Sequence, residues 1–196
     1  MVRRRWLVYN ISKMMNHGGS MSSSSVEGEF IPVNIALLTV SDTRNEQTDT
    51  SGRLLVERLD TAGHQLAEKM ILPDSIYQIR ALVSKWIADP AVEVVIITGG
   101  TGMTDRDHTP EAITPLLDKT IDGFGELFRA LSYEEIGSST IQSRVLGGIA
   151  NGTFIFAIPG SNNACSVAWD RILGPQLDSR TRPCNFVQLF SRLKRD

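Results

Sequence analysis

Three runs rich in β-branched and aliphatic residues constrain the fold of this chain more than any other feature of its sequence. They are Val33–Val40, Val92–Thr98 and Thr153–Ile158. A strand with one solvated face alternates apolar and polar residues, whereas a strand buried on both faces is apolar almost throughout. The three runs therefore predict central strands of a mainly parallel sheet, with helices covering both of its faces.

Helical patterns alternate with these strands, which implies right-handed crossovers and an α/β fold. The further expected elements are a helix capped by Thr50 or Ser51 and closed by Gly63, a weaker strand at Gln65–Leu72, a helix between Asp74 and Asp89, one that begins at Thr109, and helical stretches at Gly125–Ile136, Thr140–Ile149 and Ala164–Leu177. Some apolar residues of these helices are expected in the core. They are Trp86, Cys165, Trp169 and the stripe Phe124, Leu127, Phe128 and Leu131, for which a subunit contact is the alternative.

The composition fits one domain of ordinary size. The 196 residues are 41% hydrophobic and 21% charged, close to the globular average. Two cysteines, Cys165 and Cys184, are too few for a disulfide framework and lack metal-ligand spacing, which favours a reducing, cytoplasmic location. No apolar run approaches the roughly 18 residues of a membrane span, so we expect no membrane partner.

The first residues differ from the rest in charge and complexity. Residues 1–25 carry four cationic side chains and no acid, so a total net charge of -2 leaves -6 on the remainder. An acidic body argues against nucleic acid as a partner. The Gly- and Ser-rich stretch Asn16–Ser25 cannot bury enough apolar surface to become ordered. We expect residues 1–29 to be a disordered or non-native extension, with the native start at Met21, and residues 30–196 to form a single domain with a short C-terminal tail.

Small, polar and acidic residues follow three of the predicted strands. Ligands bind to an open α/β sheet outside the carboxyl ends of its strands, so these segments are expected to form one site. The turn Gly99–Gly102 removes three side chains and lets backbone amides approach an anion closely. It is neither a Walker A loop nor a dinucleotide fingerprint, and a plain tight turn is the alternative. Pro159-Gly160-Ser161 allows two interpretations, an anion site or ordinary capping by Ser161.

The loop that follows the glycines gathers charged side chains. Carboxylates beside a phosphate repel it unless a divalent cation lies between them, so Asp105 or Asp107 is a candidate Mg²⁺ ligand. The alternative is that Asp107 caps the next helix, that Asp105 and Arg106 form a solvated pair, and that His108 is a solvated loop histidine. Asp74 is likewise either a helix cap or a residue of the same site.

Together these segments resemble the molybdenum cofactor biosynthesis protein B family (MoaB) and its relatives, the molybdopterin adenylyltransferases (MogA). The resemblance extends from about Phe30 to Phe186. Its stretches are Thr39–Asp42, Asp49–Gly52, Thr98–Gly102 with Arg106–Ala112, Gly123–Glu126, Ser143-Arg144 and Ile158–Ser161. The tail Arg180–Phe186 resembles protein B rather than the adenylyltransferase.

The resemblance implies a three-layer α/β/α sandwich with a mostly parallel sheet, the molybdopterin-binding fold, in a homotrimer or hexamer. It also implies molybdopterin binding and, in the catalytic relatives, adenylylation of molybdopterin by Mg²⁺ and ATP with release of pyrophosphate. The two catalytic aspartates of those relatives map onto Asp74 and Asp107, which are also expected to hold Mg²⁺. Some protein B members depart from the pattern at both positions, so the two aspartates favour an enzyme. A non-catalytic binding or scaffold protein of the same pathway, in contact with other pathway proteins, is the alternative.

The remaining expected site residues fall into two groups. The phosphate- and nucleotide-binding group is Thr39, Ser41, Asp42, Gly99, Gly100, Thr101 and Gly102. The molybdopterin-binding group is Ser143, Arg144, Pro159, Gly160 and Ser161. The reaction requires no acid/base pair, because a phosphate monoester is already an anionic nucleophile near neutral pH.

Overall fold

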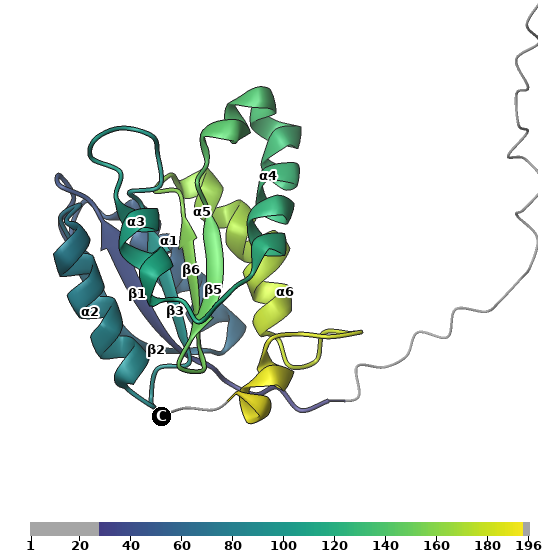
Figure 1. Cartoon of the computed structure of the whole chain (residues 1–196). Coiled ribbons are helices and arrows are strands. Elements are labelled where there is room, and N and C mark those ends of the chain that lie inside the picture. The colour runs from purple at the N-terminus through teal and green to yellow at the C-terminus, as the bar shows by residue number, and fades with distance from the viewer. Residues whose placement is uncertain (1–27, 194–196) are drawn as a thin grey trace, which may run out of the picture.

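The structure is a computed structural model that describes residues 28–193 (Figure 1). Its strands are β1 (Asn34–Val40), β2 (Gln65–Leu72), β3 (Val94–Thr98), β4 (Lys119–Thr120), β5 (Leu146–Ala150) and β6 (Thr153–Ile158). Its α-helices are α1 (Thr50–Ala62), α2 (Ile76–Ala88), α3 (Thr109–Ile113), α4 (Asp122–Ile136), α5 (Asn162–Ala168) and α6 (Gly174–Leu177). Shorter 3₁₀ turns are η1 (Thr114–Leu116), η2 (Gly137–Gln142) and η4 (Val187–Arg192), and η3 (Trp169–Leu173) is π-helical. The expectations for residues 1–27, including a native start at Met21, lie outside the described residues.

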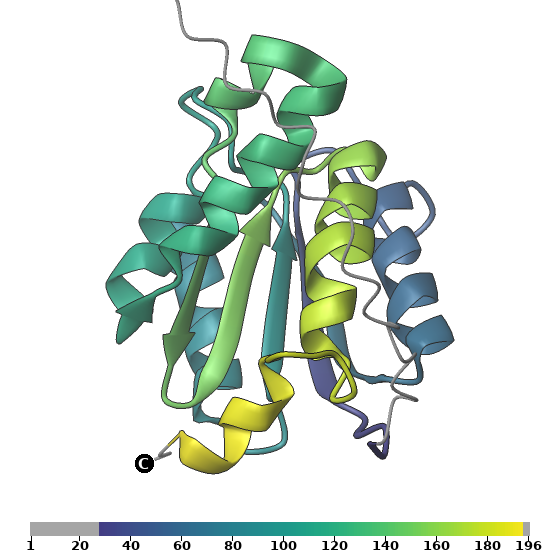
Figure 2. The ribbon, with the colours of Figure 1, turned by 90° about the vertical axis from the view of Figure 1, so that its right-hand side faces the viewer.

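One six-stranded sheet, in the order β2-β1-β3-β6-β5-β4, forms the middle layer. β2, β1, β3 and β6 are parallel, and β5 runs antiparallel to both of its neighbours, β6 and β4. Helices α2 and α3 cover one face, while α1, α4 and α5 cover the other (Figures 1 and 2). The predicted three-layer α/β/α sandwich with a mostly parallel sheet is therefore confirmed.

The core lies on both sides of the sheet, because successive residues of a strand point to opposite faces. Ile35 and Leu37 of β1 pack in the cluster under α1, α4 and α5, and Ala36 and Leu38 pack in the cluster under α2 and α3. This double burial is why the first apolar run does not alternate with polar residues. Three residues expected in the core are buried there: Trp86, Cys165 and Trp169.

The helix expected at Thr140–Ile149 is wrong. The segment contains η2 and then β5, which pairs with β6 across a tight turn at Asn151-Gly152. Both turn residues have positive φ, 45° and 76°, and Asn-Gly is the preferred pair for such hairpin turns. A Cβ at Gly148 would lie 2.5 Å from Leu117 Cδ1, so this strand needs glycine where it packs under the chain that leads to β4.

Two further expectations about helices need correction. Asp49, and not Thr50 or Ser51, caps α1, because its Oδ1 accepts a 2.9 Å hydrogen bond from the backbone N–H of Gly52. Leu127 is 46% exposed, although its neighbours Phe124 and Phe128 are buried as expected. Helix periodicity placed Leu127 at the margin of the apolar stripe, where a side chain is only partly covered.

A buried histidine makes the stability of the fold dependent on pH. His64 Nδ1 accepts a 3.2 Å hydrogen bond from the N–H of Val33, and its ring lies between Phe30 and Trp169. Burial lowers the pKa of His64, and the attraction of Asp178 opposes the shift only in part. The unfolded state therefore binds the proton more readily than the folded state below about pH 6.5.

We expect the free energy of unfolding to be fully retained above that pH and to fall as the pH is lowered, by at most about 1.4 kcal/mol per unit from this group. Urea unfolding at pH 7.5 and pH 5.5 measures the effect. His64→Gln keeps an acceptor without the titration, so it should be less sensitive to pH than the wild type. Equal pH sensitivity in the two proteins would rule out His64 as the cause.

Candidate functional site

The glycine turn after β3 is the centre of the site. Gly99 and Gly100 have φ of 103° and 63°, a region that side chains disfavour. A Cβ on Gly99 would lie 2.2 Å from the carbonyl oxygen of Val40, and one on Gly100 would lie 2.6 Å from Asp74 Oδ2. The absence of side chains here brings the end of β1 and the segment after β2 against the turn, as the sequence predicted.

Asp74 lies at the carboxyl end of β2 with its side chain only 3% exposed. Its Oδ1 accepts hydrogen bonds from the backbone N–H of His108 at 3.0 Å and faces His108 Nδ1 at 3.2 Å. Burial raises the pKa of Asp74, against the opposing effect of these contacts. The capping interpretation is wrong, because Ser75 is the N-cap of α2 and Asp74 points to the loop before α3. His108 is accordingly a partner of Asp74 and not a free loop histidine.

The Asp107 side chain binds to the backbone of the loop that precedes it, residues 102–107. Its Oδ1 accepts from the N–H of Gly102 at 3.0 Å, and its Oδ2 accepts from the N–H and the hydroxyl of Thr104 at 2.9 and 2.6 Å. Burial alone raises the pKa of Asp107, but these hydrogen bonds outweigh it and hold the pKa below its ordinary value. Asp107 does not cap α3, whose N-cap is His108. These three hydrogen bonds fix the shape of the loop.

A surface ion pair joins this loop to the end of β1. Arg106 contacts Asp42, whose Oδ1 also accepts a 3.2 Å hydrogen bond from the N–H of Asp74. The hydrogen bond from Arg106 is the main reason that the pKa of Asp42 is lowered. The alternative of a solvated pair between Arg106 and its chain neighbour Asp105 is therefore wrong, because Arg106 pairs with Asp42. The ends of β1, β2 and β3 are thus linked through Asp42.

Arg144, which precedes β5, reaches over the same loop. Its Nε donates to the carbonyl of Gly102 at 2.6 Å and its Nη2 donates to the carbonyl of Asp107 at 2.6 Å, while its Nη1 contacts Glu111. Burial raises the pKa of Glu111, but the bond from Arg144 is the leading reason that the pKa ends below its ordinary value. Ser143 lies next to it in the chain. Each of the three guanidinium nitrogens of Arg144 therefore has a partner within the protein.

The third strand end contributes backbone. Ser161 caps α5, with its Oγ accepting from the N–H of Ala164 at 3.2 Å, so the capping interpretation is confirmed. A Cβ on Gly160 would lie 3.3 Å from the Cα of Gly99, which places the Pro159-Gly160 backbone against the glycine turn. The three strand ends therefore meet, as predicted.

Some predicted residues serve other partners, and some charged residues were missed. Thr39 Oγ1 donates to Asp49 Oδ2 at 3.0 Å, and Ser41 Oγ accepts from backbone amides of its own turn. Asp49 is fully buried and pairs with Lys69 Nζ at 2.9 Å. Arg44 Nη1 donates to Ser51 Oγ at 2.8 Å, and its Nη2 lies 3.4 Å from the carbonyl of Gly160. The sequence signals for Asp49 were its place at a helix start, three residues before Gly52, and its place in the Asp49–Gly52 stretch of the family resemblance.

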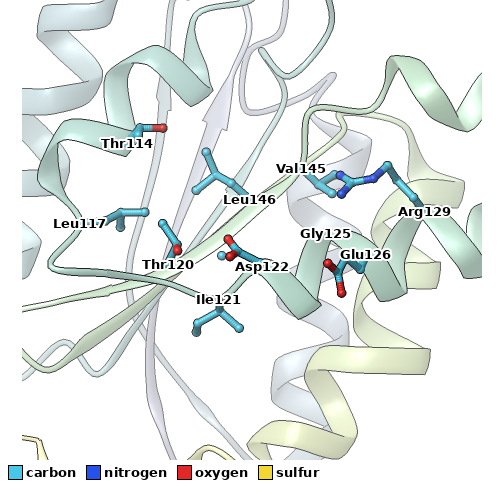
Figure 3. A pocket seen from close by; sticks show the side chains of 11 residues that line it. Thr114, Leu117, Thr120, Ile121, Asp122, Gly125, Glu126, Arg129, Val145 and Leu146 are labelled. Carbon is cyan, nitrogen blue, oxygen red and sulfur yellow. The ribbon is translucent and has the colours of Figure 1, made fainter.

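Two cavities flank the end of the sheet. One, of about 330 Å³, lies on the loop described above. It is lined by Met103, Thr104, Asp105, Asp107, His108, Glu111 and Arg144. The other, of about 290 Å³, lies between η1, the start of α4 and β5 (Figure 3). Asp122, Glu126 and Arg129 line this second cavity, and no residue expected to bind a ligand does.

The described residues contain no group of three or more His, Cys, Asp or Glu side chains arranged to hold a metal. Mg²⁺ commonly binds through one or two carboxylates together with substrate phosphates, so a closed protein cage is not required. Between residues 28 and 193 no helix is long and apolar enough to cross a membrane.

Comparison with known proteins identifies relatives across most of the chain. The family model described as "Probable molybdopterin binding domain" matches residues 36–179. Molybdenum cofactor biosynthesis protein B of Escherichia coli K12 is 57% identical over 163 residues, which cover 83% of this chain and 96% of that protein. A crystal structure of a molybdenum cofactor biosynthesis protein B has 44% identity and a TM-score of 0.73, covering 75% of this chain and 92% of its own. The tungsten cofactor synthesizing protein MoaB of Pyrococcus furiosus has 37% identity and a TM-score of 0.66, with coverages of 72% and 91%.

Proposed function

This chain belongs to the molybdopterin-binding family that includes molybdenum cofactor biosynthesis protein B and takes part in molybdenum cofactor biosynthesis, and on that premise we propose that it adenylylates molybdopterin with Mg²⁺ and ATP. Its ligand is molybdopterin, a pterin that ends in a phosphate monoester. The observation that carries the proposal is the buried carboxylate of Asp74 against the glycine turn. The same proposal places the protein in the cytoplasm as a homotrimer or hexamer.

The residues at the turn fit a magnesium-bound phosphate. Asp74 Oδ2 lies directly against Gly100, and the Asp107 carboxylate lies directly against Gly102, so both carboxylates border the turn. Asp107 already accepts three hydrogen bonds, and a carboxylate has about four acceptor positions. We therefore propose Asp74 as the principal ligand, with Asp107 supplying at most one further position. When bound, Mg²⁺ would supply neutralisation of phosphate charge.

The chain's own residues would position two anionic groups for the reaction. A phosphate oxygen of molybdopterin attacks the α-phosphorus of ATP, the bond from that phosphorus to the bridging oxygen of the β-phosphate breaks, and pyrophosphate leaves. Positioning and charge neutralisation carry such a step. In the proposal, the amides of Gly100 and Thr101 hold phosphate oxygens together with Ser41, because the amides of Gly99 and Gly102 already donate to Ile158 and Asp107. Ser143 and the Pro159–Ser161 turn hold molybdopterin. Thr39 and Asp42 act indirectly, since both are bonded to other side chains.

A second candidate function is binding without turnover. It is favoured by the relatives at 57% and 44% identity, both named protein B, and by the internal hydrogen bonds that engage Asp107 and Arg144. On this account the protein holds molybdopterin for another enzyme of the pathway. The two functions differ in one observable, the consumption of ATP.

Release of pyrophosphate tests the proposal. Purified protein with molybdopterin, ATP and Mg²⁺ should release pyrophosphate in proportion to molybdopterin, and omission of Mg²⁺ or molybdopterin should abolish the release. Binding of molybdopterin is measured in parallel by fluorescence titration. Saturable binding with no pyrophosphate would reject adenylylation and select the binding function.

A further inference from the structure

We propose that Arg144 is a positioning residue, which fixes the loop 102–107 and thereby Asp107, and that it is not a direct ligand of the molybdopterin phosphate. The inference deepens the proposed function at the same site. The claim that Arg144 fixes the loop depends only on contacts within this chain, so it can be tested even if the protein has no enzymatic activity.

Arg144 holds three successive parts of the structure at once. Its backbone N–H donates to the carbonyl of Thr101 at 3.2 Å. Its guanidinium donates to the carbonyls of Gly102 and Asp107, each at 2.6 Å, and contacts Glu111 in α3. The two carbonyls are the two ends of the loop. One side chain therefore sets the distance between the glycine turn and the start of the next helix.

The loop is fixed from its inner side by Asp107 itself. Its carboxylate holds the amides of Gly102 and Thr104, while its carbonyl is held by Arg144. Gly102 is bonded through both its N–H and its carbonyl to these two residues. Loss of the Asp107 side chain would release the N–H of Gly102, and loss of the Arg144 side chain would release its carbonyl. The placement of the Asp107 carboxylate therefore depends on Arg144.

Arginine suits this role in a way that lysine does not. The planar guanidinium presents donors in fixed, divergent directions, and here different nitrogens reach Gly102, Asp107 and Glu111. An ammonium group is a single point at the end of a flexible stem and cannot hold both carbonyls in that geometry. These contacts occupy three of the five N–H donors, one on each nitrogen, so the orientation of the guanidinium is set by the loop and by Glu111.

Hydrogen–deuterium exchange on the full chain tests the inference, with Arg144→Lys compared with Arg171→Lys. Arg171 is a matched control because it is an exposed arginine whose ion pair with Glu134 has a long N–O distance of 4.0 Å. In Arg144→Lys the amides of Gly102 and Thr104 should exchange about tenfold faster or more, while exchange in β1 and β3 stays at the wild-type rate. The control should match the wild type throughout.

Titration with molybdopterin supplies the second readout. A positioning role predicts that the Kd of Arg144→Lys stays within about threefold of the wild type, and that any measurable turnover loses kcat with little change in KM. Wild-type exchange at Gly102 and Thr104, or a Kd weakened about tenfold or more with the loop unchanged, would overturn the inference in favour of direct phosphate binding. Failure of the wild type to turn over would reject adenylylation, and the exchange and Kd results would still decide the role of Arg144.

Discussion

Asp74→Asn should reduce molybdopterin-dependent pyrophosphate release by about 10²–10³-fold, the usual scale for loss of one preorganised electrostatic group. The substitution is nearly isosteric. Asparagine Oδ1 still accepts from the N–H of His108, which is the 3.0 Å contact made by Asp74 Oδ1, so the loop before α3 keeps its anchor. What is lost is the negative charge at Oδ2, beside Gly100, where the proposed magnesium-phosphate complex needs it.

The comparison requires three measurements on the same protein. The melting temperature and the Kd for molybdopterin should stay close to the wild type, while kcat falls. Asp60→Asn, a change to an exposed carboxylate on α1, serves as the control for removal of one negative charge and should retain full activity. Wild-type turnover in Asp74→Asn would exclude Asp74 as the group that neutralises phosphate charge.

Gly99→Ala should destabilise the fold by about 4 kcal/mol, from roughly 1–3 kcal/mol of backbone strain and a similar cost of overpacking. The residue has a φ of 103°, which disfavours any side chain, and the added Cβ would lie 2.2 Å from the carbonyl oxygen of Val40. A backbone oxygen in the central strand cannot move aside as a flexible side chain can. The end of β1 must then separate from the end of β3.

For a domain of this size the expected shift is a melting temperature lower by about 10–15 °C. Gly123→Ala is the matched control, because a Cβ there has no atom within 4 Å and alanine favours a helix by up to about 1 kcal/mol. The control should melt at or slightly above the wild-type temperature. A melting temperature of Gly99→Ala equal to that of the control would show that the turn does not need a glycine at this position.

The strands that carry the site were predictable because their signals are local. The apolar composition of runs such as Val92–Thr98 predicts strands that are buried on both faces. The glycines after this run mark a turn that only a residue without a side chain can make. Convergence of the strand ends followed from the parallel topology. The antiparallel strand β5 could not be predicted from composition, because its glycines and its short length suppress strand propensity. The local signal for it is the Asn151-Gly152 turn that joins it to β6.

The contacts inside the site were not predictable in the same way. Asp74 and His108 are 34 residues apart, and Arg144 and Gly102 are 42 apart, so no spacing rule connects them. Sequence placed Asp74 and Asp107 near the turn, but the only specific partner it offered either of them was local, a helix cap as the alternative to a role in the site. The structure shows each carboxylate bonded to loop amides instead. The partners of Asp107 are three and five residues away, whereas the buried Asp74 takes a donor 34 residues away, because a buried acceptor needs a partner regardless of its distance in the chain.

Transfer of label from ATP to molybdopterin tests the central claim most directly. ATP labelled on its α-phosphate is incubated with Mg²⁺, molybdopterin and either the wild type or Asp74→Asn, and the pterin is isolated and counted. Adenylylation predicts label on the pterin with the wild type, none when the label is on the γ-phosphate, and very little with Asp74→Asn. Molybdopterin that binds stoichiometrically to the wild type yet acquires no label would contradict the claim and leave a protein that binds the pterin without modifying it.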